Sequence, residues 1–209
     1  MSRIDLPVTA EQIAALHVGD MVTLNGVMVT ARDAGHKYLI ENFVEASPPE
    51  SEKALGDKLT PLLENGVIYH CGPIVKQDTD GTWHIVAAGP TTSIREEPYQ
   101  ARIIERFGVR GVIGKGGMGS KTRDACQAHG AVYLHAVGGA ASLLANHIVE
   151  VLDVFKEKEF GLPEAFWVIR VEEFPALVTI DSHGKSLHED VEAASASILD
   201  KLADDIRDH

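Results

Sequence analysis

Residues 109–120 read VRGVIGKGGMGS, a short apolar segment that runs into a turn rich in glycine. Val109–Ile113 predicts a buried strand, and Lys121–His129, closed by Gly130, predicts the helix that follows. Flexible glycines cost backbone entropy unless a special conformation needs them, so this turn indicates close approach of the backbone to a ligand. The stretch is therefore a strand, a turn and a helix, which is the repeating unit of an α/β sheet.

The segments on both sides of this unit alternate in the same way. Further strands are predicted at Met21–Thr30 (or a hairpin around Asn25-Gly26), Val67–Lys76, Trp83–Ala88, Ala131–Val137, Ala165–Val171 and Leu177–Asp181. Helices are predicted at Thr9–His17, Ala34–Ala46, Ile94–Phe107, Ala140–Lys156 and Leu187–Arg207, and a loop at Ser47–Gly66. The sequence thus predicts an α/β sheet with helical cover, and 209 residues suffice for one domain or two small ones.

Composition excludes several classes of function. A net charge of -12 repels phosphate backbones, so nucleic acid is a poor partner. No apolar run approaches the roughly 18 residues of a membrane span, and the first residues lack the order of a signal peptide, so a reducing cytoplasm is expected. Cys71 and Cys126 are too few for a cubane cluster or a cysteine zinc site. Together with His70 and His135, Cys71 lies in an apolar stretch and is expected to be buried.

Three of the predicted turns carry a cation where a strand ends and a helix begins. The turn after Thr30 holds Arg32, and Asp33 beside it can cap the next helix, which leaves Arg32 free. The glycine turn holds Lys115 as a point charge, with Ser120 as a candidate cap. An acidic protein that handles an anion must gather its cations locally, and these turns are places where it can do so.

The remaining turn reads AGPTTSIRE and has the richest chemistry. Ser93 and Glu96 fit a capping box at the start of the next helix. Thr91 and Thr92 then lie beside free amides at a helix N-terminus, which favours an anion. Arg95 adds a forked donor that can hold a carboxylate with two hydrogen bonds.

In open α/β sheets, ligands bind beyond the carboxyl ends of the strands. If the three strands share a sheet and a direction, Arg32, Arg95 and Lys115 converge there, and two or three cations suit a ligand with two carboxylates. Each turn also keeps a simpler interpretation, as a surface arginine, a capped helix start or a turn that only the backbone needs.

The glycine turn also invites a nucleotide-binding interpretation. Gly114, Gly116 and Gly119 fit Gly-x-Gly-x-x-Gly, and the P-loop pattern is absent. The next strand, however, ends at Val137 without the acidic residue that holds a ribose roughly 20 residues further on. A bare glycine pattern is a weak signal, so dinucleotide binding is disfavoured.

Four motifs occur in order along the chain: YHCGP at residues 69–73, GPTTSIR at 89–95, GKGGM at 114–118 and IDSHG at 180–184. As a set they resemble the class I fumarase C-terminal domain, which also occurs as a separate β subunit of two-subunit fumarases and L-tartrate dehydratases. The resemblance covers about residues 18–187 of a single domain of residues 1–209, with 188–209 a polar C-terminal helix or tail.

This resemblance implies a three-layer, swivelling β/β/α domain and a partner. It implies a [4Fe-4S] cluster held by three cysteines of the α subunit, whose open iron binds the substrate hydroxyl as a Lewis acid. No cluster or other metal is expected on this chain alone, and an α2β2 assembly is expected. The implied activity is reversible hydration of fumarate to L-malate, with dehydration of L(+)-tartrate to oxaloacetate as the second candidate. A different class of function, a non-catalytic anion-binding module, also stays open.

The resemblance also implies roles for individual residues, matched position by position. The family's base for the carbon-bound proton falls on Thr91, and its acid partner is an aspartate of the α subunit. The residues implied to bind the substrate are Arg32, Thr92, Arg95, Lys115 and Gly116, with Asp33 and His36 supporting them from behind.

Overall fold

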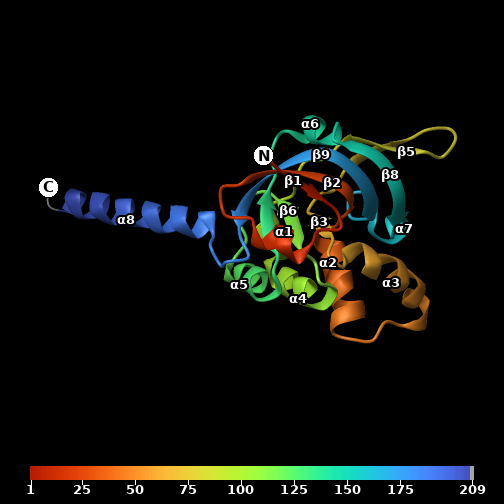
Figure 1. The fold of residues 1–209 in the computed structure, drawn as a ribbon, viewed down its shortest axis with the longest axis horizontal. Coiled ribbons are helices and arrows are strands. Elements are labelled where there is room, and N and C mark those ends of the chain that lie inside the picture. Colours follow the sequence, from red (N-terminus) through yellow and green to blue (C-terminus); the bar gives the residue numbers. More distant parts are fainter. Residues whose placement is uncertain (208–209) are drawn as a thin grey trace.

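The computed structural model describes residues 1–207 and shows a mixed α/β fold built on one large sheet (Figure 1). Within these residues the sheet has seven strands in the order β1-β2-β3-β6-β7-β9-β8. The first five strands in this order run parallel, and β9 is antiparallel to β2, β7 and β8. The strands are β1 (Ser2–Asp5), β2 (Met21–Thr30), β3 (Val67–Tyr69), β6 (Gly111–Gly114), β7 (Val132–His135), β8 (Ile148–Phe155) and β9 (Phe166–Ile180).

Strand β9 closes the sheet on itself. It pairs with β2 from Met21↔Leu177 to Val29↔Val168 and also with β7, so β2, β3, β6, β7 and β9 form a ring of hydrogen-bonded neighbours. The ring fixes the order of β2, β3 and β6, which is what sets the positions of the turns that follow them.

Side chains alternate between two hydrophobic cores along these strands. In β6, Ile113 belongs to the core enclosed between the curved strands, whereas Val112 faces the helices. In β9, Trp167 and Phe166 divide in the same way. Both faces are thus buried, which is why β3 and β6 read as short continuous apolar runs.

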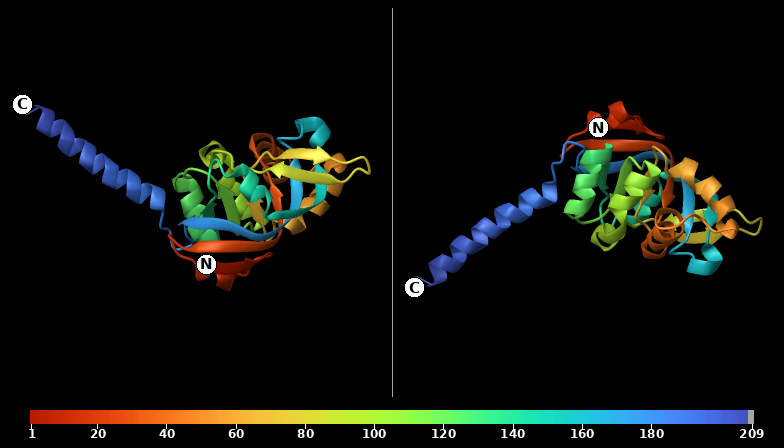
Figure 2. Two further views of the ribbon diagram at one scale, coloured as in Figure 1. Left: turned by 90° about the horizontal axis from the view of Figure 1, so that it is seen from above. Right: turned by 90° about the horizontal axis from the view of Figure 1, so that it is seen from below.

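Helices cover one side of the sheet, and the long strands and a hairpin curve over the other (Figure 1). The helical side contains α2 (Asp33–Leu39), η1 (Ile40–Val44), α3 (Glu50–Leu63), η2 (Ser93–Glu96), α4 (Glu97–Phe107) and α5 (Ser120–His129). The remaining elements are α1 (Ala10–Ala14), the β4 (Ile74–Gln77) and β5 (Trp83–Ala87) hairpin, α6 (Ala141–Ala145), α7 (Glu157–Phe160) and α8 (Leu187–Arg207). Helix α8 extends away from the rest of the chain (Figure 2).

Several predicted elements are confirmed. Thr9 and Gln12 form the predicted capping box of α1, and α4 ends at Gly108 in the left-handed conformation. Met21–Thr30 is one strand with a bulge at Leu24/Gly26 rather than a hairpin.

Two predicted elements are wrong. The loop expected at Ser47–Gly66 is mostly α3, which begins after Pro49 and contains Pro61. Burial of Leu59 and Leu63 stabilises this helix in spite of the proline. The helix expected at Ala140–Lys156 is the short α6 followed by β8, because β8 finds a partner in β9.

Two further differences concern strand boundaries. The strands expected at Ala165–Val171 and Leu177–Asp181 are one long strand, β9, in which Glu173 adopts a positive φ. The strand expected at Val67–Lys76 divides into β3 and β4, and β4 leaves the sheet to form the hairpin with β5.

Candidate functional site

Two of the three cationic turns lie at the carboxyl edge of neighbouring parallel strands. The expectation that all three follow strands of one sheet is wrong for the Arg95 turn, because that turn follows β5 of the separate hairpin. Neighbours β2, β3 and β6 end at Thr30, Tyr69 and Gly114. Arg32 follows the first of these ends by two residues, and Lys115 follows the last by one. The strand order that the local sequence cannot reveal therefore brings these turns to one edge of the sheet.

The segment that carries Thr91 extends the sheet between β3 and β6. The Thr91 amide donates to the carbonyl oxygen of His70 at 2.6 Å, and the Lys115 amide donates to the Thr91 carbonyl at 3.2 Å. The Ser93 amide then donates to the Lys115 carbonyl at 3.0 Å. Thr91 is half-buried and Thr92 exposed, so the backbone of both is fixed while their side chains remain at the surface.

Two ion pairs hold the arginines of the site. Arg95 forms an ion pair with Asp33, across the gap between η2 and α2. Arg32 Nη1 lies 3.1 Å from Oε1 of Glu164, whose other oxygen accepts from the Ala34 amide at 3.0 Å. The direct Asp33 contact joins two turns that lie far apart in the sequence.

Two glycines, Gly72 and Gly138, lie next to the cations, and only the first is required there by space. A Cβ at Gly72 would stand 2.4 Å from the carbonyl oxygen of Pro163 and 2.8 Å from both Cδ and Nη1 of Arg32, so this position requires glycine. A Cβ at Gly138 would stand 3.4 Å from Cδ of Lys115, which is ordinary contact. Gly116 is exposed and has a positive φ of 72°, a conformation that side chains rarely adopt. Among the described residues, Lys115 is in no ion pair.

The capping roles expected at the three cationic turns, for Asp33, for Ser120 and for the Ser93–Glu96 capping box, are wrong. No side-chain cap bond is made at Arg32, Thr92 or Gly119, the residues that precede α2, η2 and α5. Asp33 binds Arg95 instead of capping, and Ser120 lies inside α5.

Glu97, a residue from another helix, caps α5. Its carboxylate accepts from the Gly119 amide at 2.8 Å and from the amide and hydroxyl of Thr122 at 3.2 Å and 2.7 Å. Local pattern matching cannot find a cap that comes from more than 20 residues away, and this explains the error at Ser120.

Behind the turns lies a chain of buried polar side chains. Gln100 Oε1 lies 3.0 Å from Nε2 of His36 and 2.9 Å from Nε2 of His70. His70 Nδ1 lies 2.9 Å from Oγ of Ser93, and His36 Nδ1 lies 2.9 Å from the carbonyl oxygen of Arg32. All four side chains are fully buried. The chain links the Arg32 turn, the end of β3 and the Thr91 segment through direct contacts.

Glu96 is the acidic group beside this chain. It is fully buried, and neither carboxyl oxygen has a hydrogen-bond partner, although Oε2 lies 3.5 Å from Nδ1 of His36. Burial, and then the negative charge of Asp33, raises the pKa of Glu96 to about 8, against the opposing effect of Arg95. Burial also lowers the pKa of His36 and, more strongly, that of His70. The carboxyl group of Glu96 therefore binds a proton near neutral pH.

The sequence contained a signal for part of this chain of buried polar side chains. Glu96, Gln100, Ile103, Ile104 and Phe107 follow the helical spacing of one face, and all are buried. Two polar residues on that otherwise apolar face mark buried polar groups. Glu164, which holds Arg32, gave no such signal.

The cysteines do not fit an iron–sulfur cluster. Cys71 and Cys126 are both fully buried, belong to different cores, and have thiol pKa values that burial raises to about 12. Within residues 1–207, no group of three or more His, Cys, Asp or Glu side chains is arranged to hold a metal ion. Of the expected core residues, His70 and Cys71 are buried and His135 is half-buried.

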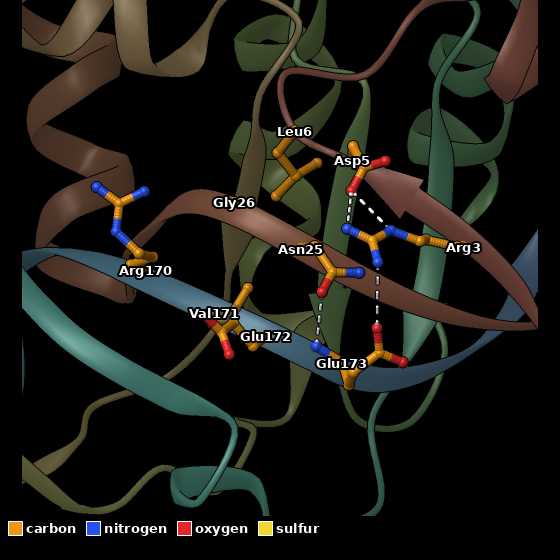
Figure 3. Close-up of a pocket in the computed structure, with 9 residues that line it drawn as sticks. All are labelled: Arg3, Asp5, Leu6, Asn25, Gly26, Arg170, Val171, Glu172 and Glu173. Atoms are coloured by element: carbon orange, nitrogen blue, oxygen red, sulfur yellow. Dashed lines mark hydrogen bonds and ion pairs between the residues drawn. The ribbon is translucent and has the colours of Figure 1, made fainter.

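A separate pocket lies beside the middle of β2 (Figure 3). Its polar groups engage one another: Arg3 lies 2.9 Å from Asp5 and 3.8 Å from Glu173, and Asn25 accepts from the Glu173 amide at 2.9 Å. These contacts join β1 and the bulged part of β2 to Glu173 of β9, so the polar groups of the pocket have a structural role.

Comparisons with known proteins show the family to which the chain is similar. The family model described as "Fumarase C-terminus" matches residues 1–191. A "Putative fumarate hydratase class I" of Geobacillus stearothermophilus is 51% identical over 200 residues, which are 94% of this chain but 35% of that protein. The "L(+)-tartrate dehydratase subunit beta" of Escherichia coli (strain K12) is 37% identical over 204 residues, 97% of this chain and 94% of that one.

A third relative, the "Putative L(+)-tartrate dehydratase subunit beta" of Methanocaldococcus jannaschii, is 38% identical over 195 residues, 93% of this chain and 94% of that one. The chain thus spans about a third of the Geobacillus protein and nearly all of each tartrate dehydratase subunit. No helix among residues 1–207 is long and apolar enough to cross a membrane.

Proposed function

Because this chain belongs to the fumarase C-terminus family, we propose that it is the β subunit of a hydro-lyase for a four-carbon dicarboxylate. Hydration of fumarate to L-malate is the first candidate, since the relative that is 51% identical carries the name "Putative fumarate hydratase class I". Dehydration of L(+)-tartrate to oxaloacetate is the second, since two relatives are named as β subunits of that enzyme. The proposed partner is an α subunit that carries the [4Fe-4S] cluster, in a cytoplasmic α2β2 assembly.

The proposal includes the fold and its motion. The ring of strands with helices on one side supports a three-layer β/β/α domain of the swivelling kind. In this proposal the domain turns against the α subunit and closes the carboxyl edge of β2, β3 and β6 over the substrate.

One observation carries the assignment of the site: three turns distant in sequence meet around Thr91. Arg32 and Arg95 each have forked donors that suit a carboxylate, and Lys115 adds a point charge at the end of β6. These cations and the exposed Thr92 and Gly116 are proposed to bind the two carboxylates.

Thr91 is proposed to take the proton from the substrate carbon. A threonine hydroxyl is a weak base unless cations and amides stabilise its anion. The Thr91 backbone is fixed between those of His70 and Lys115, which supports a defined position for its side chain in this proposal. Asp33 and His36 are proposed to support the arginines from behind, through the contacts described above.

The test is a reconstituted complex. The chain is co-expressed with its cluster-bearing partner, the cluster is reconstituted without oxygen, and both fumarate hydration and tartrate dehydration are assayed. Turnover of either substrate by the complex, and by neither subunit alone, is expected. Binding of fumarate without turnover in a complex with a full cluster would instead identify a non-catalytic anion-binding module.

A further inference from the structure

The charges around Arg95 balance in a way that depends on Glu96. Arg32 and Arg95 face the carboxylates of Glu164 and Asp33, so these four charges cancel and Lys115 leaves one positive charge in excess. Glu96 is buried among them. If Glu96 and His36 together hold one proton, their own charge is zero, whichever of the two carries it. If this proton leaves, the pair gains one negative charge, which cancels the excess positive charge that attracts a dicarboxylate to the site.

The geometry leaves Glu96 with little to stabilise its anion. Neither of its oxygens accepts a hydrogen bond. The imidazole of His36 lies 3.5 Å away, and the carboxylate of Asp33 is close enough to favour the protonated form of Glu96. Besides His36, the groups that face it from the surrounding elements are Asp33 on α2, Arg95 on η2 and Glu164 before β9. Two of these three are carboxylates, which oppose a further negative charge, and Arg95 is already paired with Asp33.

We infer that Glu96, paired with His36, is a positioning residue of this site: its buried proton keeps the positive charge of Arg95 available to the substrate carboxylate, and loss of that proton weakens substrate binding. This inference rests on the proposed function, because it assigns a role in dicarboxylate binding. The group itself touches no substrate. It acts through Asp33, which shares its charge with Arg95, and through His36, which contacts the carbonyl oxygen of Arg32.

The deciding measurement is the split between KM and kcat across pH in the reconstituted complex. For the wild type, KM for the substrate turned over is expected to rise about five- to tenfold as the pH passes about 8, while kcat changes by less than about twofold. Glu96→Gln and Glu96→Met, two uncharged variants of similar size, should both give a flat KM profile. Glu105→Gln, which removes an exposed charge from the adjoining helix α4, should keep the wild-type profile.

A second measurement separates this inference from the proposed function. Carbon-13 NMR of the isolated chain with labelled glutamate follows the Glu96 carboxyl, which is identified by its loss in Glu96→Gln. A titration above about pH 7 is expected, and a titration near the ordinary glutamate range, about 4 to 5, would overturn the inference even in an active enzyme. A pH-dependent KM that persists in Glu96→Gln would also overturn it. A complex that turns over neither substrate defeats the proposed function, and calorimetric titration of fumarate across pH then decides whether Glu96 controls binding.

Discussion

Gly114→Ala is expected to destabilise the protein severely, because the added methyl group has no space. A Cβ at this position would lie 1.7 Å from Oγ and 3.1 Å from Cβ of Ser93, and 3.2 Å from Nδ1 of His70. Ser93 is fully buried, and its Oγ lies 2.9 Å from that same nitrogen. The substitution therefore cannot be accommodated without breaking the Ser93–His70 hydrogen bond.

The magnitude follows from two losses. Leaving buried polar groups without partners costs about 1–3 kcal/mol. Forcing extra volume into a packed interior costs roughly another 1–3 kcal/mol, since Ser93 Cβ and the His70 ring must also shift. A loss of about 2–6 kcal/mol would lower the melting temperature of a domain of this size by about 5–20 °C.

The assay is urea unfolding and thermal melting of the isolated chain, with a double-mutant cycle. Ser93→Ala removes the hydroxyl that the new methyl group meets, so the double variant should lose less stability than the sum of the two single variants. Gly138→Ala is the matched control, because its methyl group would meet only Cδ of Lys115 at 3.4 Å. Additive effects of the two single variants, or a Gly114→Ala melting temperature equal to that of the control, would refute the reasoning.

Three further predictions concern the same region. Thr91→Val should lower kcat of the reconstituted complex by about 10²- to 10⁴-fold with little change in KM, and near-native kcat in this variant would remove the base assignment. Arg95→Met should instead raise KM, by about tenfold to a hundredfold. Glu97→Ala should destabilise the chain by about 1–2 kcal/mol, because it removes the acceptor of three hydrogen bonds at the start of α5, and Glu105→Ala in the same melting experiment should not. The pKa of Glu96 is raised in the folded state, so its contribution to stability is present below about pH 4.5 and is lost as the pH rises towards about 8. Glu96→Gln should therefore gain stability over the wild type across that window, by about 2–4 kcal/mol at its upper end, and an equal difference between the two proteins at about pH 5 and pH 8 would contradict this account.

The sequence predicted the strand, turn and helix units well where both propensity and burial pointed the same way. Val109–Ile113 is apolar and short, and it became β6 with both faces buried. Ala140–Lys156 failed because its apolar residues fit helical spacing, whereas residues 148–155, IVEVLDVF, are rich in β-branched residues. Hydrogen bonding to β9 stabilises the strand over the helix here. The sequence of the segment alone does not reveal that a partner strand is present.

The candidate site divides in the same way. Arg32, Arg95 and Lys115 could be selected from the sequence, because each lies in a local strand-to-helix turn. Their meeting at one edge depends on the order β2-β3-β6, which the ring closed by β9 enforces. The contact between Arg32 and Glu164 spans more than 130 residues, and no local pattern announces it.

The buried polar chain explains why this site should be sensitive to substitutions that touch no substrate. His36, Gln100, His70 and Ser93 occupy space that apolar residues would fill at lower desolvation cost, and each makes at least one hydrogen bond to another member. Removing one member leaves its neighbours buried without partners, so the cost exceeds that of the bond itself. Because the same chain connects the Arg32 carbonyl, the end of β3 and the Thr91 segment, its loss would move the cations relative to one another as well as lower stability. When such variants are heated, their activity should consequently be lost at a lower temperature than the one at which the protein unfolds. Loss of both at the same temperature would mean that the buried polar chain only fills the interior and does not position the turns.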